Sequence, residues 1–146
     1  MAFERLWHKS YTPGVPNEVD IVQITMPEAL SRAAKNWPDT VAYIYMGKKI
    51  TYKELEGLVN RFTRALKELG VGRGDKVAML LPNIPEAGIA DHAVYRLGAV
   101  TSMNNPLYTE RELEYQLNDS DATVLITLDL LLPRALKLKD KTRIKT

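Results

Sequence analysis

The sequence predicts an α/β fold with a short parallel sheet, helices on its flanks and a β-hairpin near the N-terminus. Two apolar runs, at 77–80 and 123–126, have the uninterrupted pattern of strands that are buried on both faces. Amphipathic segments with helix-capping residues lie before and between these runs. The resulting order of strand, helix, strand, helix, strand is typical of right-handed βαβ units.

The length and composition are those of one domain without disulfide bonds. The chain has 146 residues, of which 45% are hydrophobic and 26% charged, and this is enough to build a core. It contains no cysteine, which excludes a disulfide framework, a thiolate metal site and a cysteine nucleophile. The charged N-terminus lacks the apolar run of a signal peptide, and no stretch of about 18 apolar residues predicts a membrane span. These features favour a cytoplasmic protein.

The formal net charge of +2 arises in the last ten residues, KLKDKTRIKT, which hold five basic residues and one acidic residue. The remainder keeps 15 of the 20 basic and 17 of the 18 acidic residues, so it is slightly acidic. A nucleic-acid-binding face interleaves basic and aromatic side chains, and this tail has no aromatic residue. We therefore expect no nucleic-acid partner and interpret the tail as a solvated end.

The N-terminal part predicts an arm followed by a capped helix. Residues 1–24 show weak periodicity and contain Pro13 and Pro16, which indicates an extended arm. Thr25 is a capping residue at the start of an amphipathic helix, and Pro38 ends that helix.

A hairpin and the clearest helix follow. The run 41–46 predicts a strand, with a turn at 47–48 and a return strand over 49–52. Thr51 and Glu54 have the spacing of a capping box at the start of the next helix, and Gly70 lies where a left-handed cap would end it.

The remaining chain alternates between strands and helices. The predicted elements are a strand at 77–80, a helix over 83–98 between Pro85 and Gly98, a strand at 99–103, a helix from the capping box of Thr109 and Glu112 to about Asn118, and a strand at 123–126. A last helix-like segment is interrupted by Pro133, and the alternation then calls for a further strand where the sequence ends.

The stretch GVGRGD offers three glycines, Gly70, Gly72 and Gly74, as a candidate phosphate cradle. A dinucleotide fingerprint would need a third glycine where Asp75 stands, and it would follow a strand rather than a helix. The C-terminal end of the preceding helix also repels phosphate. The tripeptide Arg73-Gly74-Asp75 is equally weak as an adhesion signal, so we predict a plain helix-to-strand turn.

Metal and acid–base candidates are few. The two histidines, His8 and His92, are far apart in sequence, and Asp91 and His92 are helix neighbours whose side chains point about 100° apart. No serine lies in a nucleophile elbow. The carboxylates of Glu54 and Glu112 are accounted for by capping, and those of Glu110 and Glu114 by a solvated helical face.

One polar segment carries a functional possibility. Asn104, Asn105 and Tyr108 follow the carboxyl end of a predicted strand, where open α/β sheets bind ligands. An ordinary turn built from asparagine and proline is the competing interpretation.

Two assembled blocks identify a family: KKITYKELEGLVNRFTRALKELGVGRGDKVAMLLPNIPE and GAVTSMNNPLYTERELEYQLNDSDATVLI. Together they resemble the N-terminal region of acyl-CoA synthetases, members of the adenylate-forming superfamily. The segments YTPGVP and NPLYTERELEYQLNDSDA are most similar to long-chain fatty-acid–CoA ligases. Where relatives commonly read Val-Pro-Leu-Asn-Pro, this chain has Ser102-Met103-Asn104-Asn105-Pro106, and where they often read Lys-Ala-Gly it has Arg96-Leu97-Gly98.

The resemblance implies a reaction that the whole enzyme performs. A carboxylic acid, here a fatty acid, attacks ATP to give an acyl-adenylate and pyrophosphate, and coenzyme A then displaces AMP, with Mg²⁺ accompanying the ATP. The family's phosphate loop, its Tyr-Gly-x-Thr-Glu segment, its ribose-binding aspartate and its catalytic lysine have no counterpart in this sequence. The resemblance therefore assigns no catalytic, cofactor-binding or metal-binding residue here, and no cofactor is expected on this chain alone.

We accordingly expect an extended arm at 1–24 and, at 25–146, an incomplete N-terminal α/β domain of an adenylate-forming enzyme, truncated at its C-terminus and inactive alone. A stand-alone, non-catalytic α/β binding module remains an alternative. So does a part of another adenylate-forming enzyme, such as an aryl-acid ligase or a peptide-synthetase adenylation domain. An unfinished sheet would leave an open edge, which favours a homo-oligomer.

Overall fold

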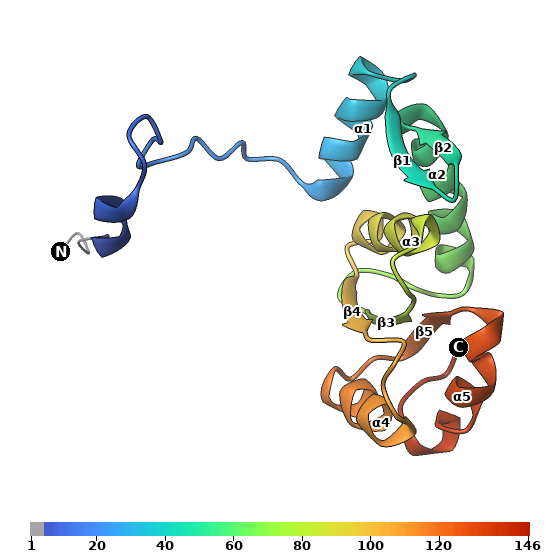
Figure 1. Cartoon of the computed structure of the whole chain (residues 1–146). Helices are drawn as coiled ribbons and strands as arrows, with labels where there is room; N and C mark the ends of the chain where they lie inside the picture. The colour runs from blue at the N-terminus through green and yellow to red at the C-terminus, as the bar shows by residue number, and fades with distance from the viewer. Residues whose placement is uncertain (1–4) are drawn as a thin grey trace.

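A computed structural model describes residues 5–146 (Figure 1). The elements run in the order η1 (Leu6–Ser10), α1 (Met26–Asn36), β1 (Val41–Tyr45), β2 (Lys48–Thr51), α2 (Tyr52–Glu68), β3 (Lys76–Leu80), α3 (Pro85–Arg96), β4 (Val100–Asn104), α4 (Glu110–Asp119), β5 (Val124–Thr127), η2 (Asp129–Leu131), α5 (Leu132–Leu136) and η3 (Lys139–Lys141). The predicted α/β class is confirmed, with a separate two-stranded hairpin of β1 and β2.

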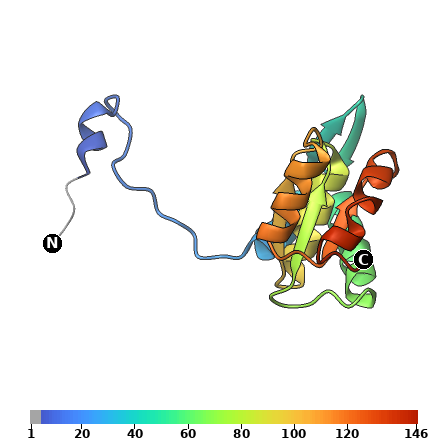
Figure 2. The same ribbon diagram turned by 90° about the horizontal axis from the view of Figure 1, so that it is seen from below.

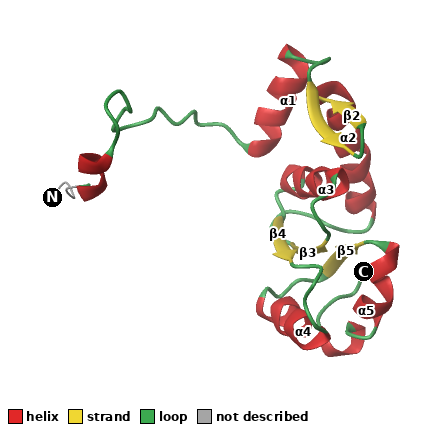
Figure 3. Ribbon diagram, viewed as in Figure 1, coloured by secondary structure: helices red, strands yellow, loops and turns green. Residues whose placement is uncertain are grey.

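The main sheet has three parallel strands in the order β4-β3-β5. Helices α2 and α3 lie on one side of this sheet and α4 and α5 on the other (Figures 1 and 3). The central strand β3 is apolar from Val77 to Leu80 because it is covered on both faces, as the uninterrupted run predicts.

Residues of β3 that point to opposite faces of the sheet belong to two separate hydrophobic cores. Val77 packs with α1, α2 and α3 in the first core, whose buried residues include Val59, Leu66 and Val94. Ala78 and Leu80 point to the opposite face. There they form the second core with Leu113, Leu117, Ala122 and Leu138.

Side-chain caps begin three of the helices as the sequence predicts. The Thr51 hydroxyl accepts a hydrogen bond from the Glu54 backbone N–H at 3.3 Å, and the Glu54 carboxylate accepts one from the Thr51 N–H at 2.8 Å. The same reciprocal pair joins Thr109 and Glu112 at the start of α4. At α1, Thr25 accepts from the Glu28 N–H. These contacts satisfy backbone donors that a helix leaves unpaired.

The hairpin turn lies one residue earlier than predicted. Tyr45 pairs with Lys48, so the loop consists of Met46 and Gly47 rather than Gly47 and Lys48. Both loop residues have positive φ, 48° and 80°. A two-residue hairpin loop matches the twist of its strands when both central residues adopt this conformation, which places the turn here despite the non-glycine Met46.

The C-terminal segment is more integrated than a solvated end. Pro133 lies in the first turn of α5, where proline is tolerated, so it begins that helix instead of interrupting it. Lys137 forms an ion pair with Glu110, and Lys141 and Arg143 pair with Glu114 and Asp121. The basic tail therefore complements the acidic α4 helix and the turn that follows it.

The N-terminal segment from residue 5 to Thr25 extends away from the α/β body (Figures 1 and 2). It contains the short 3-10 turn η1, which the sequence did not predict. Its side chains Val19, Ile21 and Val22 are exposed. In the described part of the chain, no helix has the length and apolar character needed to cross a bilayer.

Candidate functional site

A binding site is expected at the carboxyl ends of the parallel strands, because open α/β sheets bind ligands outside these ends. The three ends meet at one edge of the sheet. They carry Asn104 at the end of β4, Leu81 after β3, and Thr127 at the end of β5 with Leu128 after it.

Asn104 is the predicted site residue with the most unusual surroundings. It is 4% exposed and is the only buried polar residue in the described chain. Its side-chain amide donates to the Ser102 carbonyl oxygen at 2.8 Å, but its Oδ1 atom has no protein partner. A buried acceptor without a donor is costly, so this oxygen atom is left able to accept a further hydrogen bond.

Asn105 and Tyr108 are accounted for by the turn that follows β4. The Asn105 side-chain oxygen accepts from the Leu107 N–H at 2.9 Å, and its carbonyl accepts from the Tyr108 N–H. The Tyr108 ring packs against the second core. Arg134 fixes the turn from α5, since one guanidinium nitrogen donates to the Pro106 and Tyr108 carbonyls, both at 2.8 Å. The structure thus favours the turn interpretation for both residues.

An apolar groove of about 530 Å³ opens at the carboxyl ends of β3 and β5, which we call the α2–β5 groove. Its lining comes from α2, the start of α3 and the end of β5. The lining residues are Leu58, Arg61, Phe62, Ala65, Leu81, Glu86, Ile89, Ala90, Ile126, Thr127 and Leu128. The groove suits an apolar group, with Arg61 and Glu86 as its charged side chains. The groove could not be predicted from the sequence because its residues come from separate elements.

A polar junction joins α1, α2 and α3 around Arg96. The Arg96 side chain is 14% exposed, and its guanidinium group contacts Glu56 and Asn60 on α2, and Ser31 on α1 at 3.2 Å. Ser31 also donates to Glu56 at 3.0 Å. A single side chain therefore ties three helices together through charge-assisted hydrogen bonds. Nothing in the local sequence pattern of these helices indicated this network.

Asp91, His92 and Tyr43 form a partly buried cluster beside this junction. Burial lowers the pKa of His92 below its ordinary value, although the Asp91 carboxylate acts in the opposite direction. Burial raises the pKa of the Tyr43 hydroxyl, and the Asp91 charge raises it further. One nitrogen of His92 and one oxygen of Asp91 are buried without a protein partner. The side chains of this cluster do not line the α2–β5 groove.

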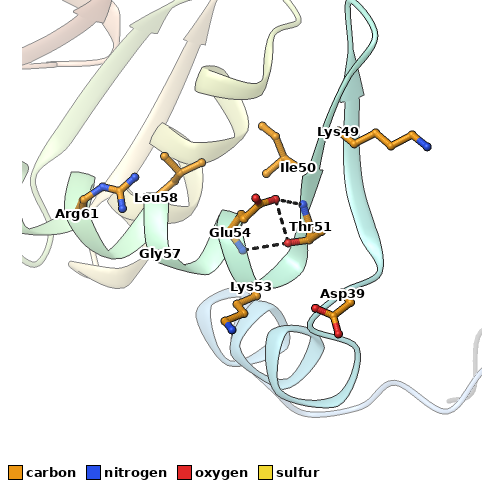
Figure 4. Close-up of a pocket in the computed structure, with 9 residues that line it drawn as sticks. All are labelled: Asp39, Lys49, Ile50, Thr51, Lys53, Glu54, Gly57, Leu58 and Arg61. Carbon is orange, nitrogen blue, oxygen red and sulfur yellow. Dashed lines mark hydrogen bonds between the residues drawn. The ribbon is translucent and has the colours of Figure 1, made fainter.

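A second, more open groove lies between the hairpin and α2 (Figure 4). Its carboxylates are Asp39 and Glu54, and its cations are Lys49, Lys53 and Arg61. The lysines and Arg61 point in different directions, so no anion-binding cluster forms (Figure 4). The hydrogen bonds from Thr51 lower the pKa of Glu54, because they stabilise its charged form. Glu54 therefore serves as a helix cap.

The glycine turn is structural, as predicted. The Gly72 N–H donates to the Asp75 carboxylate at 2.7 Å, and the Gly74 N–H donates to the Gly98 carbonyl at 2.9 Å. Gly70 and Gly74 have φ values of 89° and 86°, which favour glycine. The N–H groups of Gly72 and Gly74 therefore already have partners within the protein.

The metal candidates do not assemble. No group of three or more histidine and acidic side chains suited to a metal ion occurs among residues 5–146. His8 lies in η1 and contacts the rings of Trp7 and Tyr11, whereas His92 lies in α3.

Comparison with known proteins gives a consistent set of relatives. A model of the AMP-binding enzyme family matches residues 30–146. A long-chain-fatty-acid–CoA ligase of Bacillus subtilis is 37% identical over 139 residues, which is 95% of this chain and 25% of that protein. The corresponding ligase of Yersinia pestis is 35% identical and is covered to 26%. The chain thus spans about a quarter of the length of these curated relatives.

Solved structures share the fold. A long-chain-fatty-acid–CoA ligase from Archaeoglobus fulgidus aligns with 92% of this chain and 28% of its own length, with a TM-score of 0.84 and 25% identity. The N-terminal domain of FACL13 from Mycobacterium tuberculosis aligns with 79% of this chain and 29% of its own, with a TM-score of 0.74 and 28% identity. An anthranilate CoA ligase aligns with 83% of this chain and 24% of its own, at a TM-score of 0.77 and 25% identity.

Proposed function

The chain belongs to the AMP-binding enzyme family, and from this premise we propose that it is the N-terminal part of a long-chain acyl-CoA synthetase. The observation that carries the proposal is the continuous similarity to long-chain-fatty-acid–CoA ligases over 95–97% of the chain. The arm and the α/β body then correspond to the two regions 1–24 and 25–146 of such an enzyme.

The proposed reaction joins a long-chain fatty acid to coenzyme A at the expense of ATP. The fatty-acid carboxylate attacks ATP to form an acyl-adenylate and release pyrophosphate, and the thiol of coenzyme A then displaces AMP. Mg²⁺ accompanies the nucleotide. We propose that these steps take place on residues outside this sequence.

The residues present do not fit a nucleotide phosphate. The N–H groups of Gly72 and Gly74, which would have to face a phosphate, already donate to Asp75 and Gly98. The cations around the hairpin groove diverge (Figure 4). The described chain therefore contributes a scaffold: its capped helices and buried β3 fix the sheet on which an active site can be completed.

The proposal is tested by comparing how the chain and the full-length protein activate different carboxylic acids. Fatty-acid-dependent exchange of pyrophosphate into ATP is measured with the 146-residue chain and with the full-length gene product, using palmitate, anthranilate and acetate as acids. We expect no exchange from the chain alone and palmitate-dependent exchange from the full-length protein. Exchange by the chain alone contradicts the proposal, and a preference for anthranilate contradicts the long-chain assignment.

A stand-alone binding module is the second candidate, and the α2–β5 groove is the observation in its favour. The two candidates are separated by the coding sequence beyond Thr146. A downstream loop rich in serine, threonine and glycine that ends in Pro-Lys supports the ligase. A stop codon at that point, together with saturable binding of a fatty acid by the chain, supports the module.

A further inference from the structure

The first part of the arm is folded on itself, although it lies away from the α/β body (Figures 1 and 2). The Arg5 guanidinium forms an ion pair with the Glu18 carboxylate at 2.7 Å, 13 positions along the chain, and so joins the two ends of a loop. Within the loop, the His8 and Tyr11 rings lie with their centroids 5.4 Å apart. Residues 5–18, which we call the N-terminal loop, therefore form a closed unit of the Ω-loop kind.

This loop and the segment after it carry exposed apolar side chains. Trp7 in the loop is 58% exposed. Residues 19–25, which we call the linker, add Val19 and Ile21, which are 75% and 78% exposed. An extended chain directs Val19 and Ile21 to one side and the intervening Asp20 to the other. Tryptophan and branched aliphatic side chains gathered in this way are typical of a surface that packs against another.

The linker follows an extended path that the described residues do not explain. The hydrogen bonds that residues 19–24 make within residues 5–146 are local: the Ile24 N–H donates to the Val22 carbonyl at 3.0 Å, and the Gln23 side chain donates to the Ile21 carbonyl at 3.4 Å. Holding a chain extended without other contacts costs backbone conformational entropy. The path of the linker therefore indicates contacts outside the described residues.

The arm has a counterpart in longer relatives. Residues 25–146 are 122 of the 146 residues, or about 84% of the chain. The Archaeoglobus fulgidus ligase aligns with 92% of the chain, so that alignment extends into the arm. The sequence similarity to the Yersinia pestis ligase covers 97% of the chain and so includes most of the arm. The arm is thus shared with proteins of which this chain spans about a quarter.

We propose that the N-terminal loop and the linker pack against residues of the same polypeptide that follow Thr146. The surface that receives them is apolar where it meets Trp7 and Ile21. The seven linker residues span at most about 3.3 Å each, so the contact with the linker lies within about 23 Å of the start of α1. The arm thereby connects the first part of the enzyme to a later part by non-covalent contacts.

The short linker is the reason to favour the same polypeptide over a second copy. A surface joined to the loop by a short tether is met at an effective concentration in the millimolar range. A second copy would have to reach a comparable concentration in solution to compete. Contact within one polypeptide therefore forms first wherever the geometry allows it.

Hydrogen exchange measured by mass spectrometry tests this contact without any activity readout. Peptides covering residues 5–24 are followed in the 146-residue chain and in the full-length protein. We expect their amides to exchange at least tenfold more slowly in the full-length protein, because packing shields the backbone from water. The proposal rests on the proposed function only in taking the chain as part of a longer enzyme. The hydrogen-exchange result can therefore fail while the ATP–pyrophosphate assay succeeds, and the reverse.

Two neighbouring substitutions test which side of the linker makes the contact. Ile21→Asp places a charge in the apolar contact and should restore fast hydrogen exchange of the arm in the full-length protein. Asp20→Ala is the matched control, because Asp20 points to the opposite side of the extended linker, and slow hydrogen exchange should persist. Neither substitution should change hydrogen exchange of the α/β body, which shows that both proteins are folded.

Four results overturn the proposal. The first is an arm that exchanges equally fast in both proteins. The second is slow hydrogen exchange of the arm in the 146-residue chain alone, which assigns the contact to the described residues or to a second copy of them. The third is slow hydrogen exchange that disappears when sedimentation shows the full-length protein to be monomeric, which assigns the contact to another subunit. The fourth is a full-length Ile21→Asp protein whose arm still exchanges slowly, which excludes this side of the linker.

Discussion

The two faces of the main sheet are held by different kinds of contact. On one face, α1, α2 and α3 enclose the first core and are joined by the Arg96 junction, whose residues are up to 65 positions apart in sequence. On the other face, α4 and the C-terminal segment enclose the second core and are joined by exposed ion pairs such as Lys137 with Glu110.

The polar contacts on the two faces therefore differ in how far they are shielded from water, and this determines how much each contributes to stability. A charge that is mostly shielded from water depends on its partners, and losing it leaves those partners without compensation. An exposed ion pair contributes little because water replaces it. We therefore expect apolar packing on the two faces to contribute similarly to the free energy of unfolding. Polar contacts should contribute more on the α3 face than on the α4 face.

The largest expected losses of stability come from truncating a buried side chain in each core. These variants test whether apolar packing contributes equally on the two faces. Leu66 on α2 and Leu113 on α4 are both almost completely buried. Leu66→Ala and Leu113→Ala should each lower the free energy of unfolding by about 2–5 kcal/mol, measured by urea denaturation. A loss below about 1 kcal/mol for Leu113→Ala alone would show that the α4 face is loosely packed, which contradicts its burial.

The next effect separates the polar contacts of the two faces. Arg96→Met leaves the half-buried Glu56 without its cation and should cost about 3 kcal/mol of unfolding free energy. Arg134→Met removes two hydrogen bonds to carbonyl oxygens and should cost about 1–2 kcal/mol. Arg32→Met is the matched control, because its pair with Glu28 is exposed and should be worth less than about 1 kcal/mol. Equal losses at all three positions would contradict the comparison.

A smaller effect on stability is expected where Gly88 of α3 lies close to the Tyr43 side chain. A Cβ atom on Gly88 would overlap the hydroxyl oxygen of Tyr43, so Gly88→Ala should cost about 1–2 kcal/mol of unfolding free energy despite its better helix propensity. Gly57 lies in open space within α2, and Gly57→Ala should instead stabilise the chain by up to about 1 kcal/mol.

The cause is tested by removing the hydroxyl group. In a Tyr43→Phe background, Gly88→Ala should lose most of its cost, and a double-mutant cycle measures this coupling. An unchanged cost in that background would place the strain elsewhere in α3.

The sequence predicted the features of the fold that depend on local pattern. The capping boxes at Thr51 and Thr109, the buried run at 77–80 and the glycine turn at 70–74 are all encoded within a few residues. The hairpin turn lies one residue earlier than the sequence predicts, because Met46 adopts a positive φ that is unusual for a residue with a side chain.

Features that depend on distant residues were not predictable in this way. The Arg96 junction combines Ser31, Glu56 and Asn60, and the α2–β5 groove combines residues 58–128. The role of Arg134 in holding the turn after β4 also requires the fold, since the two segments are 26 to 28 positions apart. The sequence singled out Asn104 because it lies at the carboxyl end of a parallel strand, and the structure shows that its side chain is buried there.

The smallest expected effect is a dependence of stability on pH that belongs to the α3 face alone. The chain has two histidines, and only His92 lies in a described helix that packs against a core. Its pKa is lowered in the folded state by burial and by Arg96, and raised toward its ordinary value by Asp91 and Glu56.

Just below the ordinary histidine pKa of about 6.5, the unfolded chain therefore binds more protons than the folded chain. The free energy of unfolding consequently falls as the pH is lowered from about 7.5 to 5. His92→Gln should flatten this slope in thermal melts. The capping carboxylates Glu54 and Glu112, whose pKa values are lowered by their threonine caps, add a separate loss only below the ordinary glutamate pKa of about 4.3. A slope between pH 5 and 7.5 that survives His92→Gln would mean that His92 is not the pH-sensitive group of the α3 face, and that the two faces do not differ in this respect.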